Sequence, residues 1–82
     1  MRLFIQGMDG YVHAIDVDPA ALVHDVTVAL WPLTKIPPQA QGLLYASRQL
    51  DEWGSLSAQH VPDGARLDMI LRLYRAPRLV SY

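Results

Sequence analysis

A run of alternating residues at positions 66–74 constrains the fold of this chain more than any other feature. Every second position there is large and apolar: Leu67, Met69, Leu71 and Leu73. This is the spacing of side chains on one face of a β-strand, so we predict a strand with one face in the core. Ile70 departs from the pattern, because it places a large apolar side chain on the face that should meet water. It is either an isolated surface apolar residue or part of a contact patch.

The first part of the chain predicts a β-hairpin. Residues 2–6 and 11–17 alternate in polarity, and Asp9-Gly10 between them is a strong turn signal. His13 shares the parity of the apolar residues in the second strand. We therefore expect a half-buried histidine with a hydrogen-bond partner, and a stability that depends on pH.

After the hairpin the period changes to that of an amphipathic helix. The apolar stripe lies at i, i+3, i+4 and i+7: Val23, Val26, Thr27 and Leu30. The helix begins either at Asp18-Pro19, as N-cap and first position, or nearer Leu22. Pro32 is predicted to end it, because proline cannot donate a hydrogen bond into a continuing helix.

The rest of the chain predicts short strands. Residues 41–46 alternate, Ser47-Arg48 is predicted to be a tight turn, and residues 49–50 form a short strand. Residues 56–59 suit a single helical turn, and Asp63-Gly64 predicts the turn before the last strand. One helix on one face of a mixed sheet is an α+β layout, in which the last strand pairs in parallel with the first.

Composition excludes several classes of protein. The chain has 82 residues, enough for one core, and 51% of them are apolar against 18% charged, which favours folding over disorder. A formal net charge of −1 argues against nucleic acid or an anionic membrane as the partner. Cysteine is absent, and no signal peptide or membrane span is visible, so we expect a cytoplasmic or nuclear location.

In order and spacing the chain resembles ubiquitin and its relatives. The matching positions are Met1, Phe4, Gly10, Val17, Pro19, Val26, Ile36-Pro37-Pro38, Gln41, Leu43, Ala46, Gln49-Leu50, Leu56-Ser57, Leu67 and Leu71-Arg72-Leu73. The resemblance implies a ubiquitin-like β-grasp fold, with a mixed sheet of four to five strands packed on one helix. We expect this domain to cover residues 1–74 and a flexible tail to cover residues 75–82.

The resemblance also implies two contact patches. Met8, Leu44 and Ile70 match the main apolar patch of the family, with Asp68 and Arg48 at its rim. A second patch matches Ile36, Leu71 and Leu73. The expected partners are ubiquitin-binding modules or proteasome-type receptors, and we expect the chain to be a monomer. Asp68 stands where ubiquitin has histidine, so the rim of the main patch is more acidic and the partner set can differ.

The sequence departs from the family where conjugation requires a glycine pair. No glycine follows Gly64, and Leu73 is followed by Tyr74-Arg75-Ala76-Pro77. We therefore expect a domain that is not conjugated. The alternatives are a divergent covalent modifier and the ubiquitin-like part of a fusion precursor, for example a ribosomal one.

The sequence carries little evidence for a metal site, a catalytic site or a nucleic-acid site. His13, His24 and His60 are too dispersed for a metal site, and no catalytic set or phosphate loop is visible, so we expect no enzyme, metal or cofactor. Tail residues that could contact an acidic partner or nucleic acid are Arg72, Tyr74 and Arg75, although a solvated tail is the simpler interpretation. Trp31 and Trp53 lie outside the apolar stripes and suit either partner contact or loop packing.

Overall fold

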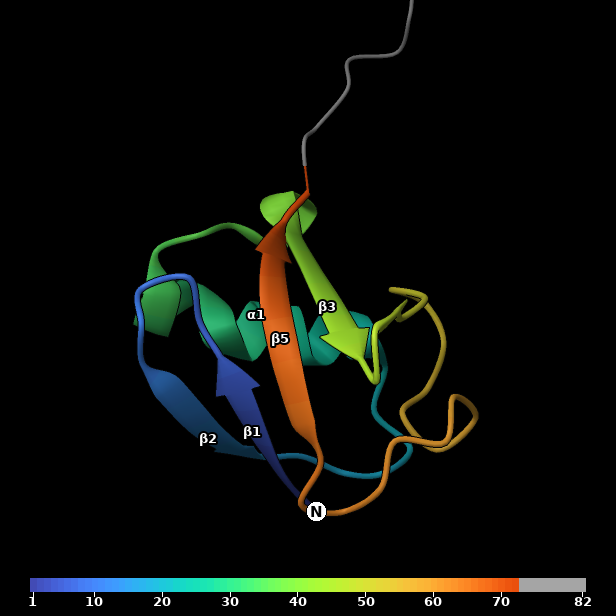
Figure 1. Cartoon of the computed structure of the whole chain (residues 1–82). Coiled ribbons are helices and arrows are strands. Elements are labelled where there is room, and N and C mark those ends of the chain that lie inside the picture. The colour runs from blue at the N-terminus through green and yellow to red at the C-terminus, as the bar shows by residue number, and fades with distance from the viewer. Residues whose placement is uncertain (73–82) are drawn as a thin grey trace, which may run out of the picture.

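The structure is a computed structural model that describes residues 1–72 (Figure 1). The predicted domain boundary after residue 74 lies outside the described residues, and so do Leu73, Tyr74 and Arg75. The elements of the described part are β1 (Arg2–Gln6), β2 (Val12–Asp16), α1 (Val23–Thr34), the 3-10 turn η1 (Pro38–Ala40), β3 (Gln41–Tyr45), β4 (Arg48–Gln49) and β5 (Arg66–Leu71).

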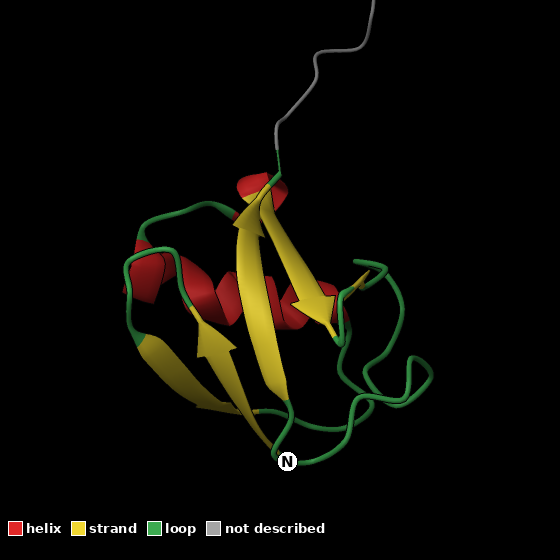
Figure 2. Ribbon diagram, viewed as in Figure 1, coloured by secondary structure: helices red, strands yellow, loops and turns green. Residues whose placement is uncertain are grey.

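The five strands form one mixed sheet in the order β2-β1-β5-β3-β4. The central strand, β5, pairs in parallel with β1 and antiparallel with β3 (Figure 1). The helix α1 crosses one face of this sheet (Figure 2). The α+β class and the parallel pairing of the first and last strands are therefore confirmed, and the arrangement is that of a β-grasp fold.

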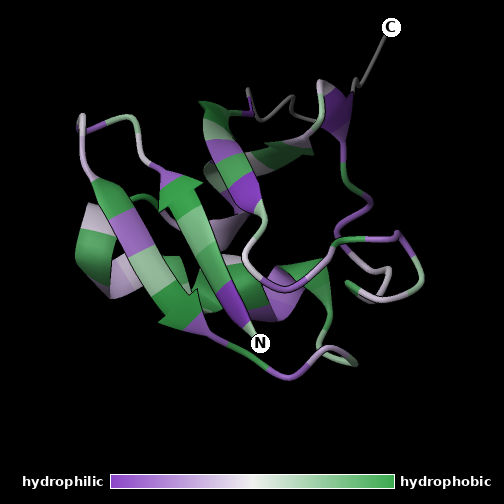
Figure 3. Cartoon of the chain, turned by 60° about the horizontal axis from the view of Figure 1, so that its bottom comes forward, coloured by the Kyte–Doolittle hydropathy of each residue, from purple (hydrophilic) through white to green (hydrophobic). Residues whose placement is uncertain are grey.

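The core lies between α1 and the covered face of the sheet. Its buried apolar residues are Leu3, Ile5, Val23, Val26, Leu30, Leu43, Leu50, Leu56, Val61, Ala65, Leu67 and Met69. Alternation of hydrophobic and hydrophilic bands along the strands is visible in Figure 3. In β5, Leu67 is 0% and Met69 is 5% exposed, but Leu71 is 50% exposed although it shares their parity. The core therefore ends before the last residue of the strand.

The helix begins at the later of the two predicted positions, with Leu22 as N-cap. The Asp18 side chain instead accepts a hydrogen bond from the Ala20 N–H (2.8 Å) in the turn before the helix. The first helical N–H groups bond elsewhere: Val23 donates to Gly54 O (3.0 Å) and His24 to Glu52 O (2.8 Å). Because a loop remote in sequence satisfies these donors, a polar N-cap side chain is not needed.

The prediction that Pro32 ends the helix is wrong. The helix continues to Thr34 with Pro32 inside it, and it ends where Lys35 adopts a left-handed conformation (φ 65°) and donates to Trp31 O (2.7 Å). Proline removes a single N–H donor. Pro32 lies in the last turn of the helix on an exposed face, so the loss of this one hydrogen bond is small. The helix therefore ends at the Lys35 C-cap.

The tight turn also lies elsewhere than predicted. Ala46 and Ser47, not Ser47 and Arg48, join β3 to β4, and both have positive φ (52° and 66°). The predicted strand at 49–50 is accordingly Arg48–Gln49, and Leu50 is in the core. Residues 56–59, predicted as a single helical turn, form hydrogen-bonded turns. The Gln59 N–H is shared between Ser55 O, which is the i→i−4 bond of one helical turn, and Leu56 O, both at 3.2 Å.

Candidate functional site

The candidate site lies on the face of the sheet that α1 does not cover, which we call the outer face. The strand register aligns one row of outer-face residues across all five strands: Val12, Gln6, Asp68, Leu44 and Gln49. Along β5 the next outer-face residue after Asp68 is Ile70, opposite Gly42 of β3. Of the predicted patch, Leu44, Asp68 and Ile70 therefore lie together on adjacent strands.

Ile70 is half-buried because it lies over Gly42. A methyl group built on Gly42 would come within 2.9 Å of Ile70 Cγ1 and 3.2 Å of Cδ1. The Gln49 side chain borders the same space, with its Nε2 at 3.4 Å from that methyl position. The absence of a side chain at Gly42 thus leaves room for Ile70 against the backbone of β3, beside Leu44.

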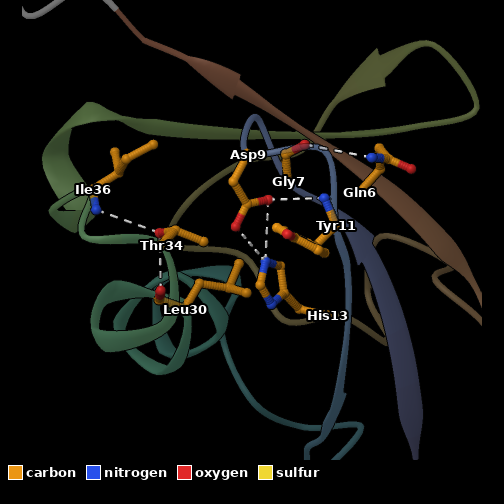
Figure 4. A network of polar contacts seen from close by, with 8 residues as sticks. All are labelled: Gln6, Gly7, Asp9, Tyr11, His13, Leu30, Thr34 and Ile36. Atoms are coloured by element: carbon orange, nitrogen blue, oxygen red, sulfur yellow. Dashed lines mark hydrogen bonds and ion pairs between the residues drawn. The ribbon is translucent and has the colours of Figure 1, made fainter.

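Met8 is 52% exposed in the turn between β1 and β2. Because Gln6 pairs with Asp68, this turn follows β1 at the end of the sheet where β5 carries Ile70. The turn is held by Asp9, whose Oδ1 accepts a hydrogen bond from the Tyr11 N–H (3.0 Å) and whose Oδ2 lies 3.0 Å from His13 Nε2 (Figure 4). The predicted half-buried His13 with a partner is therefore present.

The electrostatics of this turn follow from the same contacts. The Tyr11 N–H is the main cause that lowers the pKa of Asp9 below its usual value; desolvation opposes it, and the contact with His13 adds to it. An ionised Asp9 is thus favoured in the folded state. The turn that carries Met8 is accordingly most stable when this carboxylate is charged.

The two residues predicted for the rim of the patch lie on different strands. Asp68 is exposed on β5 between Gln6 and Leu44. Arg48 is exposed on the edge strand β4, but its Nη2 donates to Gln59 O (2.7 Å). Gln49 is the residue that pairs with Leu44, so it, and not Arg48, is the nearer neighbour of the patch.

The predicted second patch is partly described. Ile36 is half-buried against the core, and Leu71 is half exposed at the end of β5. Gln41 links the two residues. It pairs with Leu71 across β3 and β5, and its Nε2 donates a hydrogen bond to Ile36 O (2.7 Å). Leu73, the third predicted member, lies outside the described residues.

A polar cluster that the sequence does not reveal lies where β5 ends. Arg72 Nη2 is 2.9 Å from Glu52 Oε1, and His24 Nδ1 is 3.2 Å from Glu52 Oε2. The hydrogen bond from Arg72, supported by His24 and opposed by partial burial, holds the pKa of Glu52 below its usual value. Arg72, expected together with Tyr74 and Arg75 to contact a partner, here pairs with Glu52 of the same chain.

The described residues carry few other features of known sites. Within residues 1–72 no three metal-ligating side chains lie together, and no pocket is present, so the candidate site is an open surface. In the same part of the chain, no helix has the length and apolar run that a membrane crossing requires. Trp31 and Trp53, whose roles the sequence left open, are 48% and 61% exposed.

Comparison with protein-family models adds no assignment. No family model matches this chain. The β-grasp architecture and the outer-face geometry are therefore the observations on which a function can be built.

Proposed function

We propose that this chain is a ubiquitin-like protein-interaction domain that binds partners of the ubiquitin and proteasome machinery. The binding surface is the outer-face patch of Met8, Leu44 and Ile70. The observation that carries the proposal is the position of Ile70, a large apolar residue on the uncovered face, over Gly42 and beside Leu44. A cluster of exposed apolar side chains on a sheet face is typical of a contact surface.

The chemistry of the patch favours a modest affinity. A surface of this size buries on the order of a few hundred square ångströms per partner, so we expect dissociation constants in the micromolar range. The fitting partner presents a short apolar helix or a small zinc module. Asp68 in the middle of the row favours partners with a basic residue beside their apolar anchor.

The proposal includes no conjugation and no catalysis. The residues after Leu73 are Tyr74-Arg75-Ala76-Pro77, where ubiquitin-like modifiers carry a glycine pair. Activating and processing enzymes accept an extended, side-chain-free segment, and Pro77 adds a rigid ring. We expect cytoplasmic or nuclear partners for such a domain.

The experiment that tests the binding surface is an NMR titration of the ¹⁵N-labelled chain with a synthetic ubiquitin-interacting helix. We expect the amide shifts to cluster at Met8, Leu44 and Ile70, and Ile70→Ala to weaken binding about tenfold. Leu33→Ala is the matched control, because Leu33 is 51% exposed in α1 on the other side of the sheet. Shifts centred elsewhere, or equal affinity of Ile70→Ala and the parent chain, would refute the assignment.

A second experiment tests the absence of conjugation. The chain is incubated with ubiquitin-activating and ubiquitin-conjugating enzymes and ATP, and its mass is measured. We expect the mass to remain that of the free chain. A thioester or isopeptide adduct would establish the divergent modifier instead.

A further inference from the structure

Trp53 forms an exposed aromatic platform on the helix side of the molecule. Its ring stacks on the His24 imidazole, with centroids 4.4 Å apart and an interplanar angle of 27°. Trp53 nevertheless remains 61% exposed. One face of the indole is therefore covered by histidine, while most of the residue remains exposed to solvent.

The loop that carries Trp53 is tied to the start of α1. The His24 N–H donates to Glu52 O (2.8 Å), and the Val23 N–H donates to Gly54 O (3.0 Å). The backbone N–H of Trp53 donates to Asp51 Oδ1 (3.1 Å). Because backbone and ring are already held, binding at the indole costs little conformational entropy, which is typical of aromatic anchor residues at interfaces.

The surroundings of the indole are acidic. Asp51 and Glu52 precede it directly, and Asp25 lies next to His24 in the first turn of α1. Arg72 pairs with Glu52. Within residues 1–72 no cation forms an ion pair with Asp51 or Asp25, so neither of these carboxylates is neutralised by a salt bridge.

We infer that this corner, formed by Trp53, His24 and Asp51, binds an arginine or lysine side chain of a partner protein. A cation over the open face of an indole is attracted by the ring quadrupole, and tryptophan is the best aromatic partner for it. Asp51, whose Oδ1 accepts the backbone N–H of Trp53 (3.1 Å), supplies a carboxylate on the same loop for the N–H donors of the cation. The site is formed by α1 and the loop after β4, so it is independent of the outer-face patch.

The test uses the full chain, labelled with ¹⁵N, and the peptide acetyl-Gly-Arg-Gly-Arg-Gly amide as the probe. We expect the indole N–H of Trp53 to shift on titration. A peptide of the same sequence with citrulline in place of arginine keeps the shape without the charge, and it should not produce the shift. An equal response to the two peptides would overturn the inference.

Substitutions test whether binding of the arginine peptide requires Trp53 itself or only an exposed tryptophan. Trp53→Leu should weaken binding of the arginine peptide about threefold or more, and Trp31→Leu, at another exposed tryptophan, should leave it unchanged. Asp51→Asn keeps a side-chain oxygen that can accept the backbone N–H of Trp53, but it removes the negative charge. It should also weaken binding of the arginine peptide. Retained affinity in both Trp53→Leu and Asp51→Asn would overturn the site, provided their amide spectra show a folded chain.

The alternative ligand of this corner is a basic residue of the same chain, Arg75 or Arg78. The free chain is therefore compared with the double variant Arg75→Gln, Arg78→Gln. An unchanged Trp53 indole signal supports a partner protein. A shifted signal would assign the corner to the chain's own C-terminal residues and overturn binding in trans.

Discussion

At the residue scale, the contact between Gly42 and Ile70 explains how an apolar side chain is held on the uncovered face. Sequence parity alone predicts that Leu44 and Ile70 point away from the core. It does not predict that Ile70 lies opposite a glycine, because that depends on the antiparallel register of β3 and β5. The same register makes Gln49 the neighbour of Leu44.

Gly42→Ala tests this contact. The added methyl group would lie 2.9 Å from Ile70 Cγ1, so Ile70 must leave its rotamer. We expect the free energy of unfolding, measured by urea denaturation, to fall by about 1 kcal/mol. We also expect weaker binding of the ubiquitin-interacting helix. A variant with unchanged stability and affinity would show that Ile70 is not constrained by this glycine.

Glu52 provides a residue-scale prediction on pH. Its pKa is lowered in the folded state, chiefly by Arg72, so the charged form stabilises the fold. This contribution is fully present above the ordinary pKa of glutamate and is lost as the pH falls from there through the lowered pKa. Glu52→Gln should cost about 0.5–1 kcal/mol at pH 7 and reduce the slope of stability against pH in that range.

The measurement is urea unfolding at pH 7 and at several acidic values. Arg2–Asp16 is a more exposed ion pair and gives a matched comparison. Its variant Asp16→Asn should change stability less at neutral pH. A Glu52→Gln chain with the parent slope would contradict the role of the Arg72 contact.

At the element scale, both ends of α1 and the turn after β3 depend on groups that the local sequence does not identify. The start of the helix is satisfied by carbonyls of residues 52 and 54, and its end by a lysine in a left-handed conformation. The β3–β4 turn uses two non-glycine residues with positive φ. Propensity rules place such turns at Asn-Gly or Asp-Gly pairs, which explains why the predicted turn is displaced by one residue.

The β3–β4 turn can be stabilised by substitution. Ala46→Asn combined with Ser47→Gly supplies the residues that tolerate positive φ at both positions. We expect the free energy of unfolding to rise by about 1 kcal/mol, as measured by urea denaturation. Ser47→Ala keeps the strained conformation and should bring no gain. A double variant less stable than the parent would argue against this turn geometry.

At the scale of the whole molecule, stability depends on a small core to which elements distant in sequence contribute. β1 and β5 pair in parallel although about sixty positions separate them, and Gly64 N–H bonds to Arg2 O (2.7 Å) beside that pair. The Met1 amino group donates to Val17 O (2.9 Å), so the first residue is tied to the residue that follows β2. Removing a buried side chain from the central strand should therefore affect the entire domain.

Leu67→Ala makes this prediction specific. Leu67 is 0% exposed in β5, and truncation of a buried leucine costs about 2–5 kcal/mol. For a domain of this size we expect much of the total stability to be lost, with a clear decrease in the urea midpoint. Leu33→Ala, at a residue 51% exposed, should change it by less than about 1 kcal/mol. Similar losses in the two variants would contradict the proposed core.

The sequence by itself determined the two faces of each strand, the buried stripe of the helix and the order of the elements. These depend on periods of two and 3.6 residues, which are local properties of the backbone. Only the tertiary structure decided that a remote loop satisfies the start of α1, that Ile70 rests on Gly42, and that Trp53 stacks on His24. Each of these contacts joins residues far apart in the chain. The entropic cost of bringing them together is offset by burial of the whole core, and no local sequence pattern encodes that burial.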